Sequence, residues 1–351
     1  MENVKVIIWG LGSMGSGMAD MLLKKKGVDI VGVVGRGDKI GKSMYDYIKT
    51  PKGSRPDVII MAPEDIKEKS ADVVLLCTDS FTKKAFERMK LVLERKINVI
   101  TCAEEMAYPK INSPEEAKKL DEIAKANGVS VVGSGINPGL IMDLLVIVMT
   151  GCCEEVDHIV ARRVNSLSPF GPAVMEEQGI GISKEEFLDG VKTGKLSGHV
   201  GFPESIHMIA DAIGWKIDKV EQSMEPIMTD VDRIAPHKTA KAGQTAGCAM
   251  KGFGYINGEL KIEMDHPQQI EPEQAGVQTG DYVIIKGTPN INMINSPEVP
   301  GGIGTIAMCV NLIPHIINAR PGLVTMIDLP VPRAIMGDMR DFISPEAKIV
   351  K

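Results

Sequence analysis

Several features that mark other broad classes of protein are missing from this 351-residue chain. Basic residues are not in excess, because the formal net charge is -6, and this argues against a nucleic-acid partner. No apolar run approaches the roughly 20 residues needed to cross a bilayer, so we expect no contact with a membrane. The N-terminus lacks a charged leader with a small-residue cleavage site, so we expect a cytoplasmic protein.

The six cysteines give no sign of a metal site. None falls in a C-x-x-C pair, and the adjacent residues Cys152 and Cys153 cannot easily hold one metal ion. We expect all six to be buried thiols, and we expect no bound metal. The chain also lacks a Ser-His-Asp ordering, a zinc-ligand cluster and a phosphate-loop lysine, which weakens hydrolase and kinase hypotheses.

Length and composition instead predict a globular protein of about two domains. Hydrophobic residues make up 44% and charged residues 25% of the chain, which is the usual balance for such a protein. A chain of 351 residues is too long for one ordinary domain. Aromatic residues are only 4%, so we expect Met, Ile, Val and Leu to fill much of the core.

Short β-branched runs alternate with helical patterns over the first 135 residues. Strands are predicted at Val4–Trp9, Val28–Val34, Val58–Met61, Val73–Cys77, Asn98–Thr101 and Val129–Val132. Helices are predicted near Thr82–Arg95 and Pro114–Asn127, the second with Ser113 as its N-cap. This alternation predicts a Rossmann-type, doubly wound parallel sheet in an α/β protein.

The pattern changes after Pro138 to that of an α+β domain with a largely antiparallel sheet. Helices are predicted at Gly139–Thr150, Lys184–Lys192, Pro203–Ile213 and Ile303–Ile317. A strand is predicted near His158–Val164, and antiparallel strands from 216 to 295 turn at Asn257-Gly258.

These patterns divide the chain into three parts. We predict a dinucleotide-binding domain at 1–137, a substrate and dimerisation domain at 138–300, and a helix and tail at 301–351 that return to the first domain. The strands of the second part offer an edge or face for a homodimer, which is the oligomer we expect.

The N-terminal loop Gly10-Leu11-Gly12-Ser13-Met14-Gly15 fits the dinucleotide fingerprint G-x-G-x-x-G. It directly follows a predicted strand and opens a helix, which is the context the fingerprint requires. The first glycine allows the tight turn, the second admits the pyrophosphate, and the third lets helix and strand pack closely. A glycine turn without a ligand is the weaker alternative.

The residue expected to choose between NAD and NADP is not an acid. The segment after the second strand reads Val33-Val34-Gly35-Arg36-Gly37-Asp38-Lys39, and Arg36 stands about where an acid would bind the ribose of NAD. A guanidinium there suits a 2′-phosphate. We therefore predict NADP or NAD as cofactor, with dual use. In the alternative, this is a solvated basic turn and Asp38 serves the ribose.

Candidate catalytic residues follow the fifth strand, in Thr101-Cys102-Ala103-Glu104-Glu105-Met106-Ala107-Tyr108-Pro109. Ligands of a doubly wound sheet lie beyond the carboxyl ends of its strands, so this loop faces the cofactor. Glu104 or Glu105 could bind an ammonium group or carry a proton. A pair of capping carboxylates on the surface is the equal alternative.

Further binding residues are predicted at the same edge and in the second domain. Cys77 ends the fourth predicted strand and Thr78 follows it. Asn137 lies in a glycine-rich stretch where it could bond the nicotinamide carboxamide, and a plain hinge is a competing but compatible interpretation. Arg162, Arg163 and His199 could bind a substrate carboxylate, although a lone histidine is more often structural.

Taken together, these motifs resemble the 2,4-diaminopentanoate dehydrogenase family, amine dehydrogenases of bacterial ornithine breakdown. The matching stretches are Val6–Gly15, Ala103–Pro109, Gly135–Gly139, Ser168–Pro172, Gly198–Ser205 and Val299–Thr305. The first domain is also similar to that of dihydrodipicolinate reductase.

The resemblance implies a reaction and a role for one carboxylate. The implied reaction converts 2,4-diaminopentanoate, NAD(P)+ and water into 2-amino-4-oxopentanoate, ammonia and NAD(P)H, reversibly. Glu104 is implied to engage the amine or ammonium, with Glu105 as alternate, and the second domain is expected to close over the substrate. The missing acid after the second strand departs from NAD-preferring members, and it puts strict NAD use in doubt.

Two other hypotheses remain open from the sequence. One is an amine dehydrogenase or reductase that acts on another small ketone or on a cyclic imine. A cyclic-imine reductase would oxidise cofactor with dihydrodipicolinate and need no ammonia. A non-catalytic NAD(P) sensor would bind cofactor without turnover, and Glu104 together with the long second domain makes this the weakest alternative.

Overall fold

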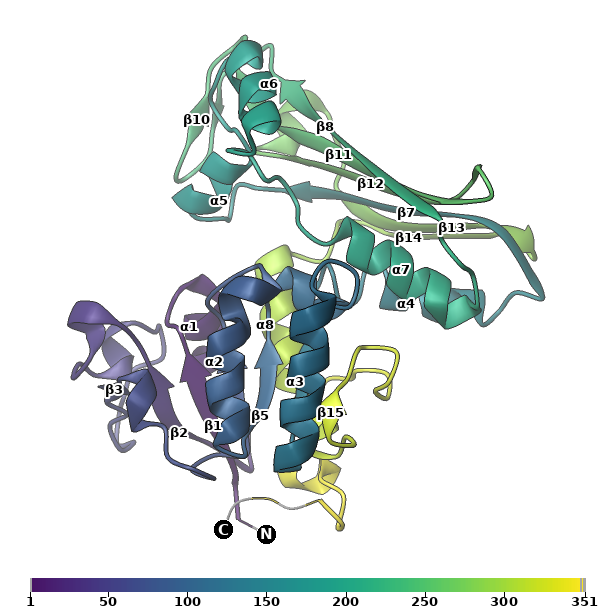
Figure 1. Cartoon of the computed structure of the whole chain (residues 1–351). Coiled ribbons are helices and arrows are strands. Elements are labelled where there is room, and N and C mark those ends of the chain that lie inside the picture. Colours follow the sequence, from purple (N-terminus) through teal and green to yellow (C-terminus); the bar gives the residue numbers. More distant parts are fainter. Residues whose placement is uncertain (1, 348, 350–351) are drawn as a thin grey trace. The chain divides into compact units, whose positions relative to one another are not determined.

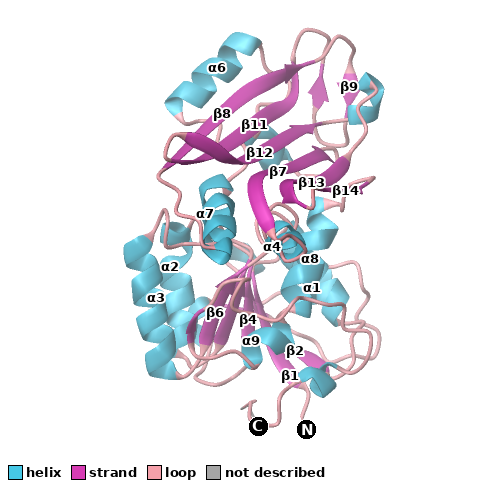
Figure 2. Cartoon of the chain, turned by 90° about the vertical axis from the view of Figure 1, so that its right-hand side faces the viewer, coloured by secondary structure: helices cyan, strands magenta, loops and turns pink. Residues whose placement is uncertain are grey.

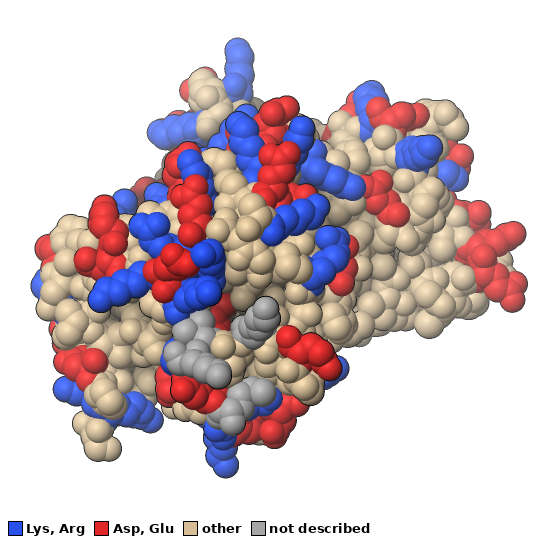
Figure 3. Space-filling view, turned by 60° about the horizontal axis from the view of Figure 1, so that its bottom comes forward, with Lys and Arg blue, Asp and Glu red and all other residues tan. Residues whose placement is uncertain are grey.

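The computed structural model describes residues 2–347 and 349, and it divides into two compact units. Unit 1 comprises the residues up to Ile136 and those from Gly302 onward, and unit 2 comprises Asn137–Gly301. Among the described residues, no helix is both long and apolar enough to cross a membrane. Acidic and basic side chains are interspersed on the face drawn in Figure 3.

Unit 1 is built on a seven-stranded sheet in the order β15-β6-β5-β4-β1-β2-β3. Its strands are β1 (Val4–Trp9), β2 (Val28–Val34), β3 (Ile60–Met61), β4 (Val73–Leu76), β5 (Asn98–Thr101), β6 (Ser130–Gly133) and β15 (Gly322–Leu323). Every pairing is parallel. All residues of β4 and β6 are buried, as expected of strands covered on both faces.

Helices cover both faces of this sheet. They are α1 (Ser13–Leu22), α2 (Thr82–Glu94), α3 (Pro114–Asn127), α8 (Gly301–Asn311) and α9 (Ile313–Ile317). Figure 2 shows α2 and α3 on one face and α1 and α9 on the other. This arrangement confirms the predicted doubly wound α/β fold.

Two local predictions in unit 1 need correction. The single helix predicted at Ile303–Ile317 is two helices, because Pro314 opens α9 and cannot continue the hydrogen bonds of α8. Ser113 does occupy the N-cap position of α3, but its hydroxyl makes no capping bond there.

Unit 2 contains a six-stranded mixed sheet in the order β14-β13-β7-β12-β11-β8 (Figure 1). Its strands are β7 (Glu155–Ser166), β8 (Lys219–Met228), β11 (Thr245–Ile256), β12 (Glu259–Gln269), β13 (Gly280–Thr288) and β14 (Ile291–Asn295). Only β7 and β12 pair in parallel within it, so the sheet is largely antiparallel, as predicted. A separate ribbon pairs β9 (Arg233–Ile234) with β10 (Thr239–Ala240).

The helices of unit 2 are α4 (Leu144–Thr150), α5 (Pro172–Glu177), α6 (Lys184–Thr193) and α7 (Phe202–Ile213). The predicted helix at Gly139–Thr150 starts late, because the Asp143 carboxylate caps α4 by accepting a bond from the Leu144 N–H at 2.6 Å. The predicted turn between β11 and β12 is confirmed. Asn257 and Gly258 have φ of 52° and 80°, as a type I′ hairpin requires.

Six short 3₁₀ helices complete the described elements: η1 (Gly37–Lys39), η2 (Met44–Asp46), η3 (Pro63–Asp65), η4 (Glu104–Ala107), η5 (Pro272–Ala275) and η6 (Met339–Phe342).

The expectation that all six cysteines are buried is wrong. Cys248 and Cys309 are buried, Cys77, Cys102 and Cys153 are half-buried, and Cys152 is exposed in the turn after α4, although all six are free thiols. Across the described residues, no three His, Cys, Asp or Glu side chains gather as metal ligands.

Candidate active site

The glycine loop of unit 1 forms a tight turn that leaves space at the start of α1. Gly10 has φ of +100°, and a Cβ there would lie 3.0 Å from the Cys77 carbonyl oxygen. A Cβ on Gly15 would lie 1.8 Å from the Gly10 carbonyl oxygen, so only glycine allows this packing of α1. By contrast, no atom lies within 4 Å of a Cβ built on Gly12, the N-cap of α1.

This geometry fits a dinucleotide. The open space at Gly12 meets the unbonded N–H groups of the first helical turn, where an anionic pyrophosphate is stabilised. The segment after the neighbouring strand β4 borders the loop, since the Thr78 methyl lies 3.1 Å from the Gly10 Cβ position. The Cys77 thiol turns away toward the Met18 sulfur at 3.4 Å, and a bond with Cys102 and burial raise the pKa of Cys77 well above its usual value.

Arg36 is exposed directly after β2, where it forms the N-cap of η1. Lys39 reaches back to the glycine loop, with its Nζ 3.4 Å from the Leu11 carbonyl oxygen and 4.8 Å from the Tyr47 ring centroid. Asp38 pairs with Lys42 at 3.2 Å, and this bond holds the pKa of the Asp38 carboxyl below its usual range. The loop after β2 therefore presents cations on the side of the glycine loop.

Glu104 and Glu105 begin η4 directly after β5, at the carboxyl edge that also carries the glycine loop after β1. A Cβ on Gly133 would lie 2.3 Å from the Met106 backbone, so this glycine lets η4 lie against the end of β6. The Glu105 carboxylate accepts a hydrogen bond from the Thr82 N–H at 2.8 Å and so satisfies the start of α2. This contact gives Glu105 a structural role that the sequence did not distinguish from that of Glu104.

In unit 2, three polar side chains form a connected cluster. The Asn137 Nδ2 atom lies 3.3 Å from His199 Nε2, and the His199 ring meets the His266 ring edge-on, with centroids 4.9 Å apart. His266 Nδ1 lies 2.8 Å from the Arg163 carbonyl oxygen, which can only accept, so this nitrogen carries the proton. The cluster thus joins the segment after β6 to β7 and β12.

Both histidines of this cluster are neutral. Burial, with a smaller contribution from the Arg163 charge, lowers the pKa of His199 to about 3. Burial likewise lowers the pKa of His266 well below its usual value. His199 can therefore bind a ligand through a hydrogen bond but not through a positive charge.

The two adjacent arginines of β7 face opposite sides of the sheet, as alternation along a strand dictates. Arg163 is buried, forms an ion pair with Asp281 and donates to the Val299 carbonyl oxygen at 2.6 Å. Arg162 lies on the other face, where its Nε is 3.0 Å from an Asp265 oxygen. Of the two arginines, only Arg163 is brought together with the histidines.

Sequence reasoning missed His266 and Asn165, which also belong to this region. The amide oxygens of Asn165 and Asn137 are buried and, in the described part of the chain, have no hydrogen-bond partner. A signal was present on β12, where His266 continues the buried alternation of Ile262 and Met264. A polar side chain at a core position of a strand is a reason to suspect a binding role.

Asp143 fixes the segment that carries Asn137. Its carboxylate accepts bonds from the Gly139 N–H at 2.8 Å and the Ser205 hydroxyl at 2.9 Å, besides its bond to α4. Burial raises the pKa of this fully buried carboxyl, which nevertheless has three donors around it.

Comparison with known proteins assigns the family. The model of the 2,4-diaminopentanoate dehydrogenase C-terminal domain matches residues 140–345. A 2,4-diaminopentanoate dehydrogenase of Acetoanaerobium sticklandii is 76% identical over the full length of both chains. The chain belongs to the 2,4-diaminopentanoate dehydrogenase family. It is an oxidoreductase that acts on an amino group.

Solved structures share the fold. An amine dehydrogenase from Mycobacterium smegmatis superposes with a TM-score of 0.84 and 24% identity, over 96% of this chain and 98% of that one. A biliverdin reductase from Synechocystis sp. PCC 6803, solved with biliverdin and NADP+, matches with a TM-score of 0.50 and 14% identity over 92% and 93%. A nicotinamide dinucleotide is the cofactor class that this fold and the glycine loop support.

Proposed function

We propose that this enzyme oxidatively deaminates 2,4-diaminopentanoate at C4. The products are 2-amino-4-oxopentanoate, ammonia and the reduced cofactor, and the reverse reaction is a reductive amination. Identity of 76% over the full length of a 2,4-diaminopentanoate dehydrogenase supports this substrate. The observation that carries the chemistry is the half-buried Glu104 at the carboxyl edge of the sheet that bears the glycine loop.

The proposed role of Glu104 is to hold and move a proton at the reacting nitrogen. A protonated amine cannot donate its lone pair as hydride leaves C4, so the carboxylate first takes the extra proton. A nicotinamide cofactor held at the glycine loop would accept the hydride from C4. Water then adds to the substrate iminium at C4, and the adduct releases ammonia. In the reverse direction, the carboxylate binds ammonium and delivers neutral ammonia to the ketone. The Glu105 carboxylate accepts the Thr82 N–H at the start of α2, and Glu104 is proposed for the proton because the family resemblance assigns the amine to it.

We propose that the cofactor is NADP+ or NAD+. The exposed guanidinium of Arg36 suits the 2′-phosphate of NADP+, and the nearby Lys39 ammonium adds positive charge. Because neither group is required for the ribose hydroxyls of NAD+, both cofactors are expected to work. The Cys77 backbone and the Thr78 side chain are proposed to line the cofactor beside the glycine loop.

For the substrate α-carboxylate we propose the polar cluster of unit 2. Asn137 and His199 can offer hydrogen bonds to a carboxylate, and Arg163, which is paired with Asp281, lies on the same face of β7. The sequence predicts Asn137 as a cofactor ligand, and we propose instead that it binds the substrate. Arg162 is the weaker candidate, because it faces the other side of the sheet.

We also propose a homodimer through the face of the unit 2 sheet opposite α7. Glycines Gly252 and Gly254 turn toward Phe202 and Ile206 of α7, so the intervening Phe253 points to the opposite face. That face mixes apolar side chains with ion pairs of both signs, Arg162 with Asp265 and Lys251 with Glu263, a surface that a second copy can complement. A cytoplasmic location is proposed because all six cysteines are free thiols.

The direct test is turnover of 2,4-diaminopentanoate with NAD+ and NADP+ in parallel, in the wild type and in Arg36→Ala. We expect reduced cofactor and ammonia in equal amounts with both cofactors. The KM for NADP+ should rise about tenfold in Arg36→Ala, while the KM for NAD+ stays within about twofold. Lys42→Ala, which removes a neighbouring cation bonded to Asp38, is the matched control. No turnover of the diamino acid with either cofactor would refute the proposed function.

A further inference from the structure

A second hollow of unit 1 lies at the opposite edge of the parallel sheet from the glycine loop. It is lined by the end of α1, the turn Lys25–Gly27, the first residues of β2 and the tail around Asp338, and its volume is about 690 Å³. Because β2 runs parallel to β1, its first residues lie at the amino edge of the sheet, away from the proposed cofactor loop. Nothing in the proposed reaction uses this hollow.

The lining is rich in positive charge. It contains four cations and two carboxylates, Lys25, Lys26, Arg55, Arg340, Asp29 and Asp338, in a chain of net charge -6. Two of the cations are already bonded, since Arg340 pairs with Asp338 at 2.6 Å and Lys25 donates to the Ile335 carbonyl oxygen.

The other two cations are not neutralised by a carboxylate within the described residues. Arg55 donates to the Pro51 carbonyl oxygen at 3.3 Å. The exposed Lys26 ammonium helps to lower the pKa of the Asp338 carboxyl, but the effect of Arg340 on that pKa is larger. Asp29 accepts a bond from Asn3 at 3.1 Å. An anion entering the hollow would therefore meet excess positive charge.

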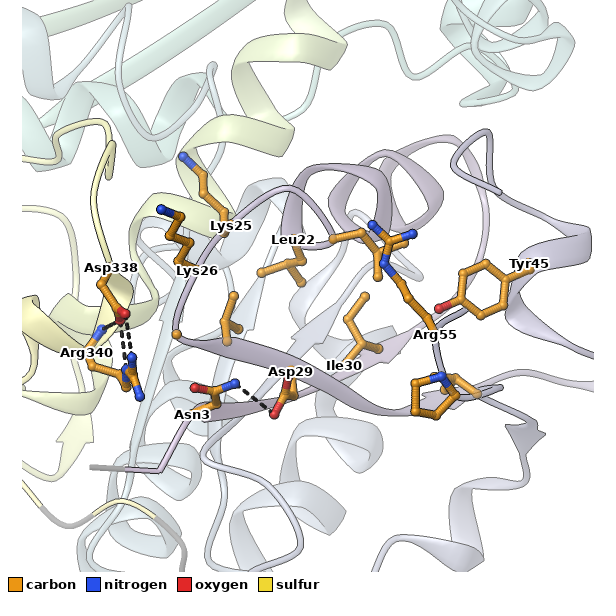
Figure 4. A pocket seen from close by; sticks show the side chains of 15 residues that line it. Asn3, Leu22, Lys25, Lys26, Asp29, Ile30, Tyr45, Arg55, Asp338 and Arg340 are labelled. Carbon is orange, nitrogen blue, oxygen red and sulfur yellow. Dashed lines mark hydrogen bonds and ion pairs between the residues drawn. The ribbon is translucent and has the colours of Figure 1, made fainter. Parts of the chain in front are cut away.

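Apolar side chains lie between the charged ends, and of these Leu22 is buried whereas Ile30 is partly accessible. Figure 4 shows Lys25, Lys26 and Arg340 toward one end and Arg55 with Tyr45 toward the other, with Leu22 and Ile30 between them. A floor of this kind buries the body of a ligand while cations at its ends hold charged groups.

We propose that this hollow binds a small organic anion, with a carboxylate or phosphate held by Lys26 or Arg55 and an apolar or planar body over Ile30. The tail supports the site from one side. The Met339 N–H donates to the Lys26 carbonyl oxygen at 2.9 Å, and a Cβ on Gly27 would lie 1.9 Å from an Asp338 oxygen, so tail and turn are closely packed. A bound anion would join α1, β2 and the tail, and would stabilise the fold of unit 1.

Two probes distinguish the sources of the anion: adenosine monophosphate for a phosphate and phenylacetate for a carboxylate. Each is titrated by calorimetry into the full-length protein saturated with NADP+, so that the proposed cofactor site is filled. Adenosine is the uncharged control. We expect saturable binding of at least one anion, none of adenosine, and a rise in unfolding temperature with ligand concentration.

Variants locate the binding. Lys26→Ala or Arg55→Ala is expected to weaken the anion about tenfold or more, according to which end of the hollow holds the charged group. Lys83→Ala, which removes an exposed cation of α2, should leave the affinity unchanged. Catalytic turnover is expected to persist in all three variants, so this test is independent of the proposed function. Absence of saturable binding of both probes, or equal affinity in Lys26→Ala, Arg55→Ala and Lys83→Ala, overturns the proposal.

Discussion

Replacing Gly12 with alanine tests the glycine loop as a pyrophosphate cradle. In the structure, nothing lies within 4 Å of the added methyl group, and the backbone of Gly12 has φ of -87°, which alanine adopts without strain. The free energy of unfolding should therefore change by less than about 1 kcal/mol. With cofactor bound, however, the methyl group would occupy the space that the pyrophosphate needs.

The expected loss of cofactor affinity follows from the displaced phosphate. Two charge-assisted bonds to N–H groups at the start of α1, lost at about 1–1.5 kcal/mol each, raise the cofactor Kd by roughly 30- to 160-fold. Calorimetric titration with NADP+ and NAD+ measures this change, and urea unfolding measures stability. Gly171→Ala is the matched control, because Gly171 is also an extended N-cap glycine with nothing within 4 Å of its Cβ position.

Gly15→Ala gives the contrasting result. Its methyl group would lie 1.8 Å from the Gly10 carbonyl oxygen and must move about 1.6 Å to reach ordinary contact, so both stability and affinity should fall. Overpacking of this kind costs about 1–3 kcal/mol. If Gly12→Ala bound both cofactors as tightly as the wild type does, the loop would not hold the pyrophosphate and the reasoning would be refuted.

Three further results are expected. Burial lowers the pKa of His199 to about 3 in the folded protein, whereas its unfolded pKa is near 6.5, so between these pH values only the unfolded chain binds the additional proton. The free energy of unfolding should therefore be about 2 kcal/mol lower at pH 5 than above pH 6.5. Urea unfolding at several pH values measures this change, and His199→Gln should remove the share of it that His199 contributes. Asp281→Asn leaves the buried Arg163 guanidinium without its charge partner and should destabilise the protein by about 3–5 kcal/mol, against little effect for Asp265→Asn beside the exposed Arg162. Phe253→Lys should raise the dimer dissociation constant in sedimentation experiments, and an unchanged dimer would exclude the proposed face.

Local sequence patterns predict much of unit 1 because its strands and helices are marked by buried runs and by stop signals. The bounds of β1, β2, β5 and α3 agree with the prediction residue for residue. Buried parallel strands read as continuous apolar runs, and Pro114 and Gly128 mark the two ends of α3. The doubly wound fold follows from these elements.

Local patterns fail where a tertiary contact decides the structure. Glu104 and Glu105 are adjacent in the sequence, and the bond from the Thr82 N–H to Glu105 is a tertiary contact that no local pattern indicates. His199 and His266 lie on different elements, so their contact depends on how α7, β7 and β12 pack within unit 2. The start of α4 is similarly set by the Asp143 side chain rather than by apolar periodicity.

The central claim is that Glu104 carries the proton chemistry of deamination, and a pair of variants tests it directly. Glu104→Gln should lower kcat for 2,4-diaminopentanoate by about 10²- to 10⁴-fold while the Kd for cofactor stays unchanged. Glu105→Gln keeps an oxygen that can accept the Thr82 bond, so its kcat should stay within a few-fold of the wild-type value. Wild-type turnover in Glu104→Gln, with activity lost instead in Glu105→Gln, would contradict the account.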